Sequence, residues 1–474
     1  MLDRCCSGVD ARSAYWPSVT DAQRVMLEMM HPVDVMNRIE SSGRLHGRSP
    51  IPFLLLGVFA LAMFSMALLA SGKGLRNLDV TCNYRLLDSV SSWLDHGFWQ
   101  LGGLLSFRDA RTAAAGLPES LYKSQSSLYV IPHYIATAIW GEEGFWAMVR
   151  TTTVVFAGVM AICCVTLTSL FVEEHQPAGG SRWLLPLSAF TAFAAALPQE
   201  GIWGSLWNYD DRALATVLLT MAATSWGLGI RSERRWPQQL GSVLLITAAL
   251  ACPRMGAMLV LVAAVAAWLD PKQGLFDRRL AMACGLATVA HYLRVLLVDS
   301  WGIFNLKGTG PLVRFGFTHE VLERGQSSLP YDHILQAFTF AWRQSQWSID
   351  ELSLSTNLQH LAVYLLAGLG LILLLLDSEA IRSRYRSVLV LMIAPALLWT
   401  VLIHQSVAEH PDVHAIMWAA PFALGWAWLV LCICRWLSKR LGDVWTVFAG
   451  CWIAYWLFLW QVQYLLRAYP NLRW

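Results

Sequence analysis

Two carboxylates, an aromatic side chain and a cation lie close together in the sequence, soon after the first long apolar run; they are Asp79, Tyr84, Arg85 and Asp88. A carboxylate at a membrane surface serves as general base for an acceptor hydroxyl if burial raises its pKa or a nearby cation orients it. A lone aspartate is more often a solvated loop residue, so this interpretation depends on its neighbours. We predict that Asp79, the closer of the two to the apolar run, is the catalytic base, with Asp88 as the second candidate.

Other ionisable or aromatic residues border or interrupt later apolar runs, at Tyr122–Lys123, Asp210–Asp211 and Arg254. Lysine and arginine hold phosphate groups by charge and hydrogen bonds, so Lys123, Arg254 and Arg85 are candidate phosphate ligands. Asp210 or Asp211 would orient an acceptor or support a cation. Each residue also has a structural explanation, as a side chain along the surface, a hairpin cap or a pair at the end of a span. Arg254 has the strongest functional claim, because a cation between two short apolar helices is costly without an anionic partner.

The segment HQSVAEHPDVH contains three histidines, His404, His410 and His414, with acidic residues between them. Pro411 restricts His410 to an extended conformation, so His410 and His414 are not expected to share one helical face. We therefore expect this loop to line a pocket for the acceptor or the lipid phosphate. A divalent metal is the less favoured alternative, and no cofactor is expected.

The composition is that of a polytopic membrane protein, because 56% of the 474 residues are apolar and only 14% are charged. The net charge of +3 is too small to indicate nucleic acid as a partner. Basic residues occur in short clusters between apolar runs, where membrane topology explains them first. The cysteines lie mostly in or beside apolar runs and have no zinc or redox spacing.

Several apolar runs are long enough to cross about 30 Å of hydrocarbon; they are 51–71, 146–172, 183–199, 212–230, 278–299, 359–376, 386–404, 415–434 and 444–466. The run 240–268 is interrupted by Pro253, Arg254 and Gly256, so it forms either one long span or a hairpin of two short helices. Residues 127–140 are short for a span and contain Pro132 and His133.

The positions of arginine and lysine decide between the two topologies. If residues 127–140 lie along the membrane surface and 240–268 form a hairpin, every basic loop falls on the side of the arginine-rich N-terminal segment. This arrangement predicts an all-α polytopic membrane protein with about eleven transmembrane helices. Residues 1–50 form a cytoplasmic segment and residues 51–474 one membrane domain. The non-cytoplasmic side then carries amphipathic surface helices within 72–144, the loops 200–212, 301–359 and 404–414, and the hairpin tip at 252–256.

The order of these residues resembles the GT-C superfamily of integral-membrane glycosyltransferases, and within it the polyprenyl-phosphate-dependent aminoarabinose and mannosyl transferases. The residues that match the first external loop of that family are Asp79, Tyr84, Gly97–Phe98–Trp99, Tyr122–Lys123, Leu128 and Gly141, followed by Arg150. A second acidic residue just before a span matches Asp210 or Asp211, and a cation at a hairpin tip matches Arg254. Gln125–Ser126–Ser127 stands where the family has paired prolines.

The resemblance implies transfer of a sugar from a polyprenyl-phosphate donor to an envelope glycan, lipid or protein acceptor, such as lipopolysaccharide. It implies inversion at the anomeric carbon and an active site on the periplasmic face of a bacterial inner membrane, with cations in place of a divalent ion. The partners would be the lipid-linked donor, the acceptor and membrane lipid. Two alternatives remain. A transporter or flippase of lipid-linked glycans predicts charges deep in the spans, and an envelope-glycan polymerase or ligase predicts that the decisive cations lie in 301–359.

Overall fold

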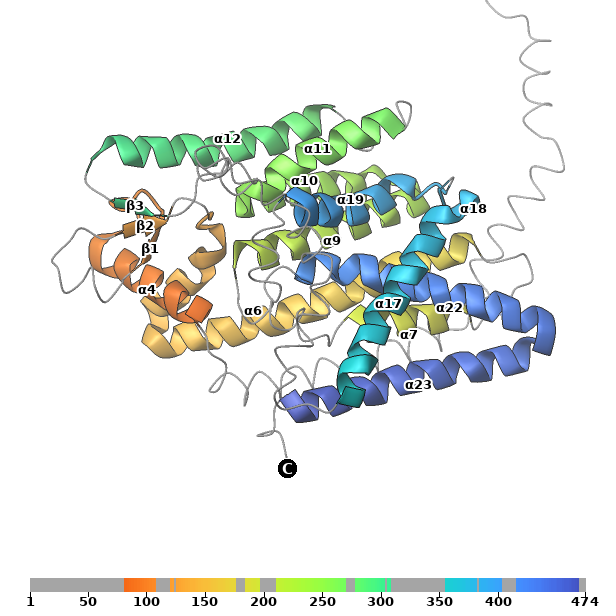
Figure 1. Ribbon diagram of the computed structural model, residues 1–474. Helices are drawn as coiled ribbons and strands as arrows, with labels where there is room; N and C mark the ends of the chain where they lie inside the picture. Colours follow the sequence, from red (N-terminus) through yellow and green to blue (C-terminus); the bar gives the residue numbers. More distant parts are fainter. Residues whose placement is uncertain are drawn as a thin grey trace, which may run out of the picture. The chain divides into compact units, whose positions relative to one another are not determined.

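Helices dominate the structure, a computed structural model that describes residues 81–107, 120–122, 125–175, 184–196, 210–269, 278–302, 305–307, 354–381, 383–402 and 415–468 (Figure 1). The helices are α4 (Thr81–His96), η1 (Leu128–Val130), α6 (Ile131–Glu174), α7 (Leu184–Ala196), α9 (Asp211–Ser232), α10 (Arg235–Ala251), α11 (Pro253–Leu269), α12 (Arg278–Ser300), α17 (Leu354–Leu376), α18 (Ser378–Ile381), α19 (Arg386–Leu402), η2 (Ala415–Trp418), α22 (Ala419–Leu441) and α23 (Asp443–Ala468). The strands are β1 (Leu105–Phe107), β2 (Ser120–Tyr122) and β3 (Asn305–Lys307).

The prediction of an all-α membrane protein is confirmed at this level, because four of the described helices are long and apolar enough to cross a membrane. They are Leu128–Glu174, Asp211–Ser232, Arg278–Ser300 and Ile416–Leu441. Three further apolar helices are shorter, at Pro253–Val265, Tyr364–Leu376 and Arg386–Leu402. The predicted N-terminal segment 1–50 and the first apolar run 51–71 lie outside the described residues.

The predicted count of about eleven spans is not supported by the described helices, of which four have the length and hydropathy of a span. Length is one physical reason. The 13 residues of α7 rise about 20 Å along the helix axis, against about 30 Å of hydrocarbon. The helices α10 and α11 have 17 residues each and rise about 26 Å. These three helices are therefore shorter than the hydrocarbon thickness.

Gly141 divides α6 into two helical segments, because its backbone angles of φ 68° and ψ −158° are not helical. Glycine adopts a positive φ without steric cost. A Cβ at Gly144 would lie 2.4 Å from the carbonyl oxygen of Ala136, so the segments on the two sides of the break approach each other closely. This division agrees with the prediction that 127–140 is separate from the span that follows. Its location at a membrane surface stays a prediction.

The run 240–268 forms the predicted pair of short helices, α10 and α11. Cys252 separates them with extended backbone angles of φ −135° and ψ 102°, and Pro253 begins α11. Proline suits the first position of a helix because its missing N–H would have no partner there. The helix α10 contacts α9 and α12, while α11 contacts α12 and α19. The hairpin tip therefore lies among several other helices.

A small sheet connects two parts of the chain that are far apart in the sequence. Strand β1 pairs antiparallel with β2, and β2 pairs parallel with β3, with Tyr122 opposite Lys307. The first of the predicted external loops, 72–144, thus meets the loop 301–359. This sheet was not expected from the sequence.

A separate hydrophobic core supports this region. We call the elements α4, β1, β2, β3 and η1 the sheet unit. Trp93 is fully buried in its core and donates a hydrogen bond from Nε1 to the carbonyl oxygen of Leu104 at 2.8 Å. Val295 and Val298, near the C-terminal end of α12, belong to the same core. The end of α12 is therefore held against the sheet unit.

Arginines from three of the basic clusters lie at the C-terminal end of α6; they are Arg231, Arg384 and Arg435. Arg231 forms an ion pair with Glu173 at 3.1 Å, and the backbone N–H of Arg384 donates to Glu174 Oε1 at 3.1 Å. Arg435 donates a hydrogen bond to the carbonyl oxygen of His175. These arginines therefore lie near one end of the helices, and the predicted topology stays a prediction.

The helices α17 and α22 cross at two glycines. A Cβ at Gly370 would lie 1.9 Å from the carbonyl oxygen of Gly425, and a Cβ at Gly425 would lie 2.2 Å from that of Ala367. Small residues allow such close backbone approach between membrane helices.

We expect Gly370→Ala to lower the thermal stability of the protein in detergent, because the added methyl group forces the helices apart and costs about 1–3 kcal/mol. Gly368→Ala is the matched control, two residues away on the same helix, because nothing lies within 4 Å of a Cβ there. The control should be neutral or slightly stabilising, since alanine favours a helix more than glycine does. Equal melting temperatures for the two variants would contradict the close crossing.

Candidate functional site

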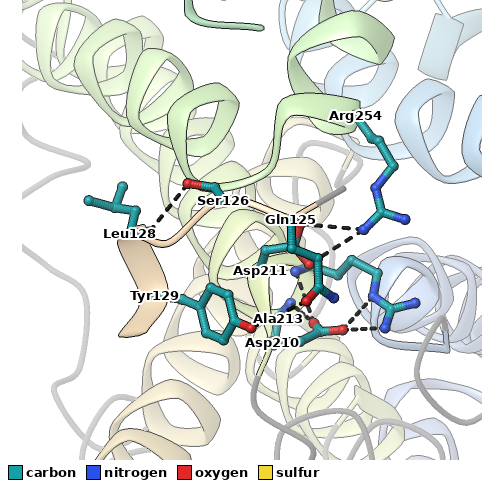
Figure 2. Close-up of polar contacts among 9 residues, drawn as sticks. Gln125, Ser126, Leu128, Tyr129, Asp210, Asp211, Ala213 and Arg254 are labelled. Carbon is teal, nitrogen blue, oxygen red and sulfur yellow. Dashed lines mark hydrogen bonds and ion pairs between the residues drawn. The ribbon is translucent and has the colours of Figure 1, made fainter. Parts of the chain in front are cut away.

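The first element of the candidate site is the N-terminus of α9, where Asp210 is the N-cap. Its Oδ1 accepts hydrogen bonds from the backbone N–H groups of Arg212 at 2.9 Å and Ala213 at 3.1 Å (Figure 2). An aspartate N-cap satisfies backbone donors that have no partner within the helix, and its charge interacts favourably with the helix dipole. The Arg212 guanidinium forms an ion pair with the same carboxylate. Asp210 is thus held in place by its own helix.

The second element is an ion pair between the start of α9 and the hairpin tip. Arg254 Nη2 lies 3.3 Å from Asp211 Oδ2 and 3.5 Å from Asp211 Oδ1 (Figure 2). The Arg254 side chain is 3% exposed and the Asp211 side chain is fully buried. The guanidinium carbon of Arg254 also lies 5.5 Å from the ring centroid of Trp399, within range of a cation–π interaction. Three helices, α9, α11 and α19, therefore meet at this pair.

The cluster contains two carboxylates and two guanidinium groups, so its own charges balance. All four residues, Asp210, Asp211, Arg212 and Arg254, are buried. Burial of an isolated charge is costly, and the cost is offset only by close pairing and further hydrogen bonds. Burial also raises the pKa of the Cys252 thiol at the hairpin tip, and the Asp211 carboxylate acts in the same direction. Cys252 therefore remains a neutral thiol next to the ion pair.

The segment that follows Tyr122–Lys123 lies next to this cluster. The short helix η1 contacts both α9 and α10, and Gln125, Ser126 and Tyr129 are drawn beside the acidic pair in Figure 2. Tyr129 donates a hydrogen bond from its hydroxyl to Gln125 Oε1 at 3.4 Å, and Ser126 Oγ accepts one from the N–H of Leu128 at 3.2 Å. These local contacts give the segment a defined conformation between β2 and the start of α9.

The structure brings together the predicted residues Asp210, Asp211 and Arg254. Asp88 lies half-buried on α4, which contacts η1. Tyr84 and Arg85 also lie on α4 and Tyr122 lies on β2, but only their backbone is described. The predicted residues outside the described parts of the chain are Asp79, Lys123, His404, His410 and His414.

One arginine that was not predicted from the sequence lies near this site. Arg294, on α12, donates a hydrogen bond from Nη1 to Ser127 Oγ at 3.2 Å, and its Nη2 lies 3.2 Å from His291 Nδ1. The sequence does contain a signal for it. An arginine and a histidine three residues apart share one helical face within an otherwise apolar run, and an ionisable residue within a span indicates function by default.

Within the described parts of the chain, no group of three or more histidine, cysteine, aspartate or glutamate side chains is arranged to hold a metal ion. Comparison of the sequence with known protein families finds no matching family, and comparison with curated proteins finds no match. The fold and the site therefore define an all-α membrane protein with a buried cluster of acidic and arginine side chains.

Proposed function

We propose that this protein is a membrane glycosyltransferase of the GT-C type. It transfers a sugar from a polyprenyl-phosphate donor to an envelope glycan, lipid or protein acceptor on the non-cytoplasmic face of a bacterial inner membrane. The observation that carries the proposal is the buried ion pair between Asp211 and Arg254. An acidic residue at the start of a span and a cation at a hairpin tip were selected separately from the sequence, and they lie in contact. Ionisable groups placed together inside a membrane protein indicate a functional site by default.

The proposed reaction is a displacement at the anomeric carbon. The acceptor oxygen attacks this carbon from the face opposite the phosphate, so the configuration inverts. The bond between the anomeric carbon and the phosphate oxygen breaks, and its electron pair stays on the lipid phosphate. The acceptor proton passes to Asp79 as general base, and the cations stabilise the charge that develops on the phosphate.

The contacts of the cluster indicate a separate role for each residue in the proposed reaction. Asp210 caps α9 and Asp211 pairs with Arg254. Because these contacts already occupy both carboxylates, both suit a positioning role better than proton abstraction. Arg254, at the hairpin tip, would stabilise a phosphate by its charge, and Lys123 and Arg85 would supply net positive charge.

The test is a transfer assay with purified protein in proteoliposomes that contain lipopolysaccharide and other envelope lipids. The donors are polyprenyl-phosphate mannose and polyprenyl-phosphate aminoarabinose, each radiolabelled in the sugar. We expect label to move to an acceptor and free polyprenyl phosphate to appear in equal amount, with one of the donors. No transfer from a full panel of lipid-phosphate sugars, by protein that is folded and monodisperse, would refute the proposal.

The same assay separates the two alternatives. A flippase would carry the labelled donor across the bilayer without releasing polyprenyl phosphate. A polymerase or ligase would lengthen or attach a glycan chain, and substitution of cations within 301–359 would abolish that product. These residues lie mostly outside the described parts of the chain, but β3 joins the start of this loop to the sheet unit.

A further inference from the structure

Arg294 differs from the arginines of the buried cluster in its partners. Arg212 and Arg254 each pair with a carboxylate. Arg294 contacts a hydroxyl and an imidazole nitrogen, Ser127 Oγ and His291 Nδ1, which are neutral acceptors. In the described parts of the chain no carboxylate forms an ion pair with it, and its buried Nε has no hydrogen-bond partner there. Its positive charge is therefore not balanced by these residues.

Arg294 lies within an apolar helix, α12, where an unpaired positive charge has a high free-energy cost. The helix ends at Ser300, which places Arg294 about 9 Å along the axis from that end. A lone arginine in a membrane helix either extends to the interface or pairs with an anion. Here the guanidinium turns toward Ser127 at the start of η1, so the site is bounded by the sheet unit. An anionic ligand would supply the missing charge.

The surface around Arg294 indicates what kind of anion fits. On one side of Arg294, α12 has a buried face formed by His291, Val295 and Val298. On the other side it has an exposed apolar face, which consists of Leu286, Val289, Leu293 and Leu297. Arg294 is half-buried at the boundary between them. A phosphate at the guanidinium would thus leave an attached hydrocarbon chain free to lie along the exposed face.

The neighbouring cluster lies close to this boundary. Thr288, six residues before Arg294 on α12, donates a hydrogen bond to the carbonyl oxygen of Pro253 at 2.9 Å. Pro253 immediately precedes Arg254. Ser127 belongs to the segment that contacts the start of α9 through η1. A ligand held by Arg294 would therefore lie beside the Asp211–Arg254 pair, on the side of the molecule where α12 is exposed.

We propose that Arg294, with Ser127 and His291, binds the phosphate of the polyprenyl-phosphate donor, whose chain lies along the exposed apolar face of α12. The inference rests on the proposed function for the identity of the lipid. Arg294 supplies the positive charge, and Ser127 supplies a hydroxyl that can donate to a phosphate oxygen. His291 accepts from Arg294 through Nδ1, which requires the tautomer with its proton on Nε2, and so it orients the guanidinium.

The experiment measures equilibrium binding of a tritiated polyprenyl phosphate without sugar to the purified full-length protein in detergent. We expect Arg294→Gln to weaken binding about 10- to 100-fold, because one charge-assisted contact to phosphate is lost. Ser127→Ala should weaken it less, by a few-fold. The matched control is Arg279→Gln, an exposed arginine on the same helix, which should bind as the wild type does. Arg294→Lys keeps the charge and should retain part of the affinity.

Competing ligands distinguish the sources of phosphate. Polyprenol, which lacks the phosphate, should compete poorly, and inorganic phosphate should compete only at much higher concentration. Competition by phosphatidylglycerol as strong as by polyprenyl phosphate would mean a general anionic-lipid site and would overturn the assignment to the donor. Unchanged affinity in Arg294→Gln that is folded and monodisperse would overturn the site itself.

Transfer measurements separate this inference from the proposed function. If Arg294-dependent binding is found but no sugar is transferred, the glycosyltransferase proposal fails and the lipid-phosphate site stands. If sugar is transferred and Arg294→Gln changes neither binding nor the KM for the donor, the inference fails alone. Support for both requires a raised KM in Arg294→Gln together with weakened binding of the sugar-free lipid.

Discussion

Arg254→Gln is expected to destabilise the protein by about 3–5 kcal/mol, because it leaves the buried Asp211 carboxylate without its cationic partner. The side chain of Asp211 is fully buried, so water cannot replace the guanidinium. A fall in the melting temperature of the purified protein in detergent measures the effect. Asp211→Asn should destabilise for the converse reason, since it leaves Arg254 next to a neutral amide.

The double variant Asp211→Asn/Arg254→Gln is expected to be more stable than the sum of the single effects allows, because it removes both charges together. The matched control is Arg231→Gln. Arg231 pairs with Glu173 at the other end of the helices, and its side chain is 35% exposed. Exposed pairs contribute about 0–1 kcal/mol, so this control should melt close to the wild type. Additive effects in the double variant would show that the buried charges do not interact strongly.

Asp79→Asn is expected to lower the rate of sugar transfer by about 10²- to 10⁴-fold, because asparagine cannot accept the proton of the acceptor hydroxyl. Binding of the sugar-free polyprenyl phosphate should be unchanged, since the base does not contact the lipid phosphate in the proposed reaction. The measurement is kcat in the proteoliposome transfer assay. Full transfer by Asp79→Asn would exclude this residue as the base.

Asp88→Asn is the comparison that separates the two candidate bases. Asp88 lies half-buried on α4, a helix that contacts η1, whereas Asp79 lies outside the described residues. If Asp79 is the base, Asp88→Asn should retain most of the transfer rate. The reverse result, with transfer lost only in Asp88→Asn, would assign the proton transfer to Asp88 and move the acceptor toward α4.

The apolar helices, and the positions where single residues start or interrupt them, could be predicted from the sequence. Pro253 and Gly256 predicted the hairpin of α10 and α11, because proline and glycine act on the backbone of their own neighbours. The acidic residues at the start of α9 could be located in the same way, since an N-cap interacts with N–H groups two or three residues away. The class of membrane protein followed from composition alone.

Tertiary structure decided which of these residues meet. Asp211 and Arg254 are 43 residues apart, and Arg294 contacts Ser127 across 167 residues. Neither contact could be predicted from a periodic pattern in the sequence. Packing between helices depends on side-chain shape and on close approaches such as that of Gly370 to Gly425. The sequence by itself thus determined the kind of protein and where its charges could lie, while the fold determined that Asp211 compensates Arg254 and that Arg294 contacts Ser127 and His291.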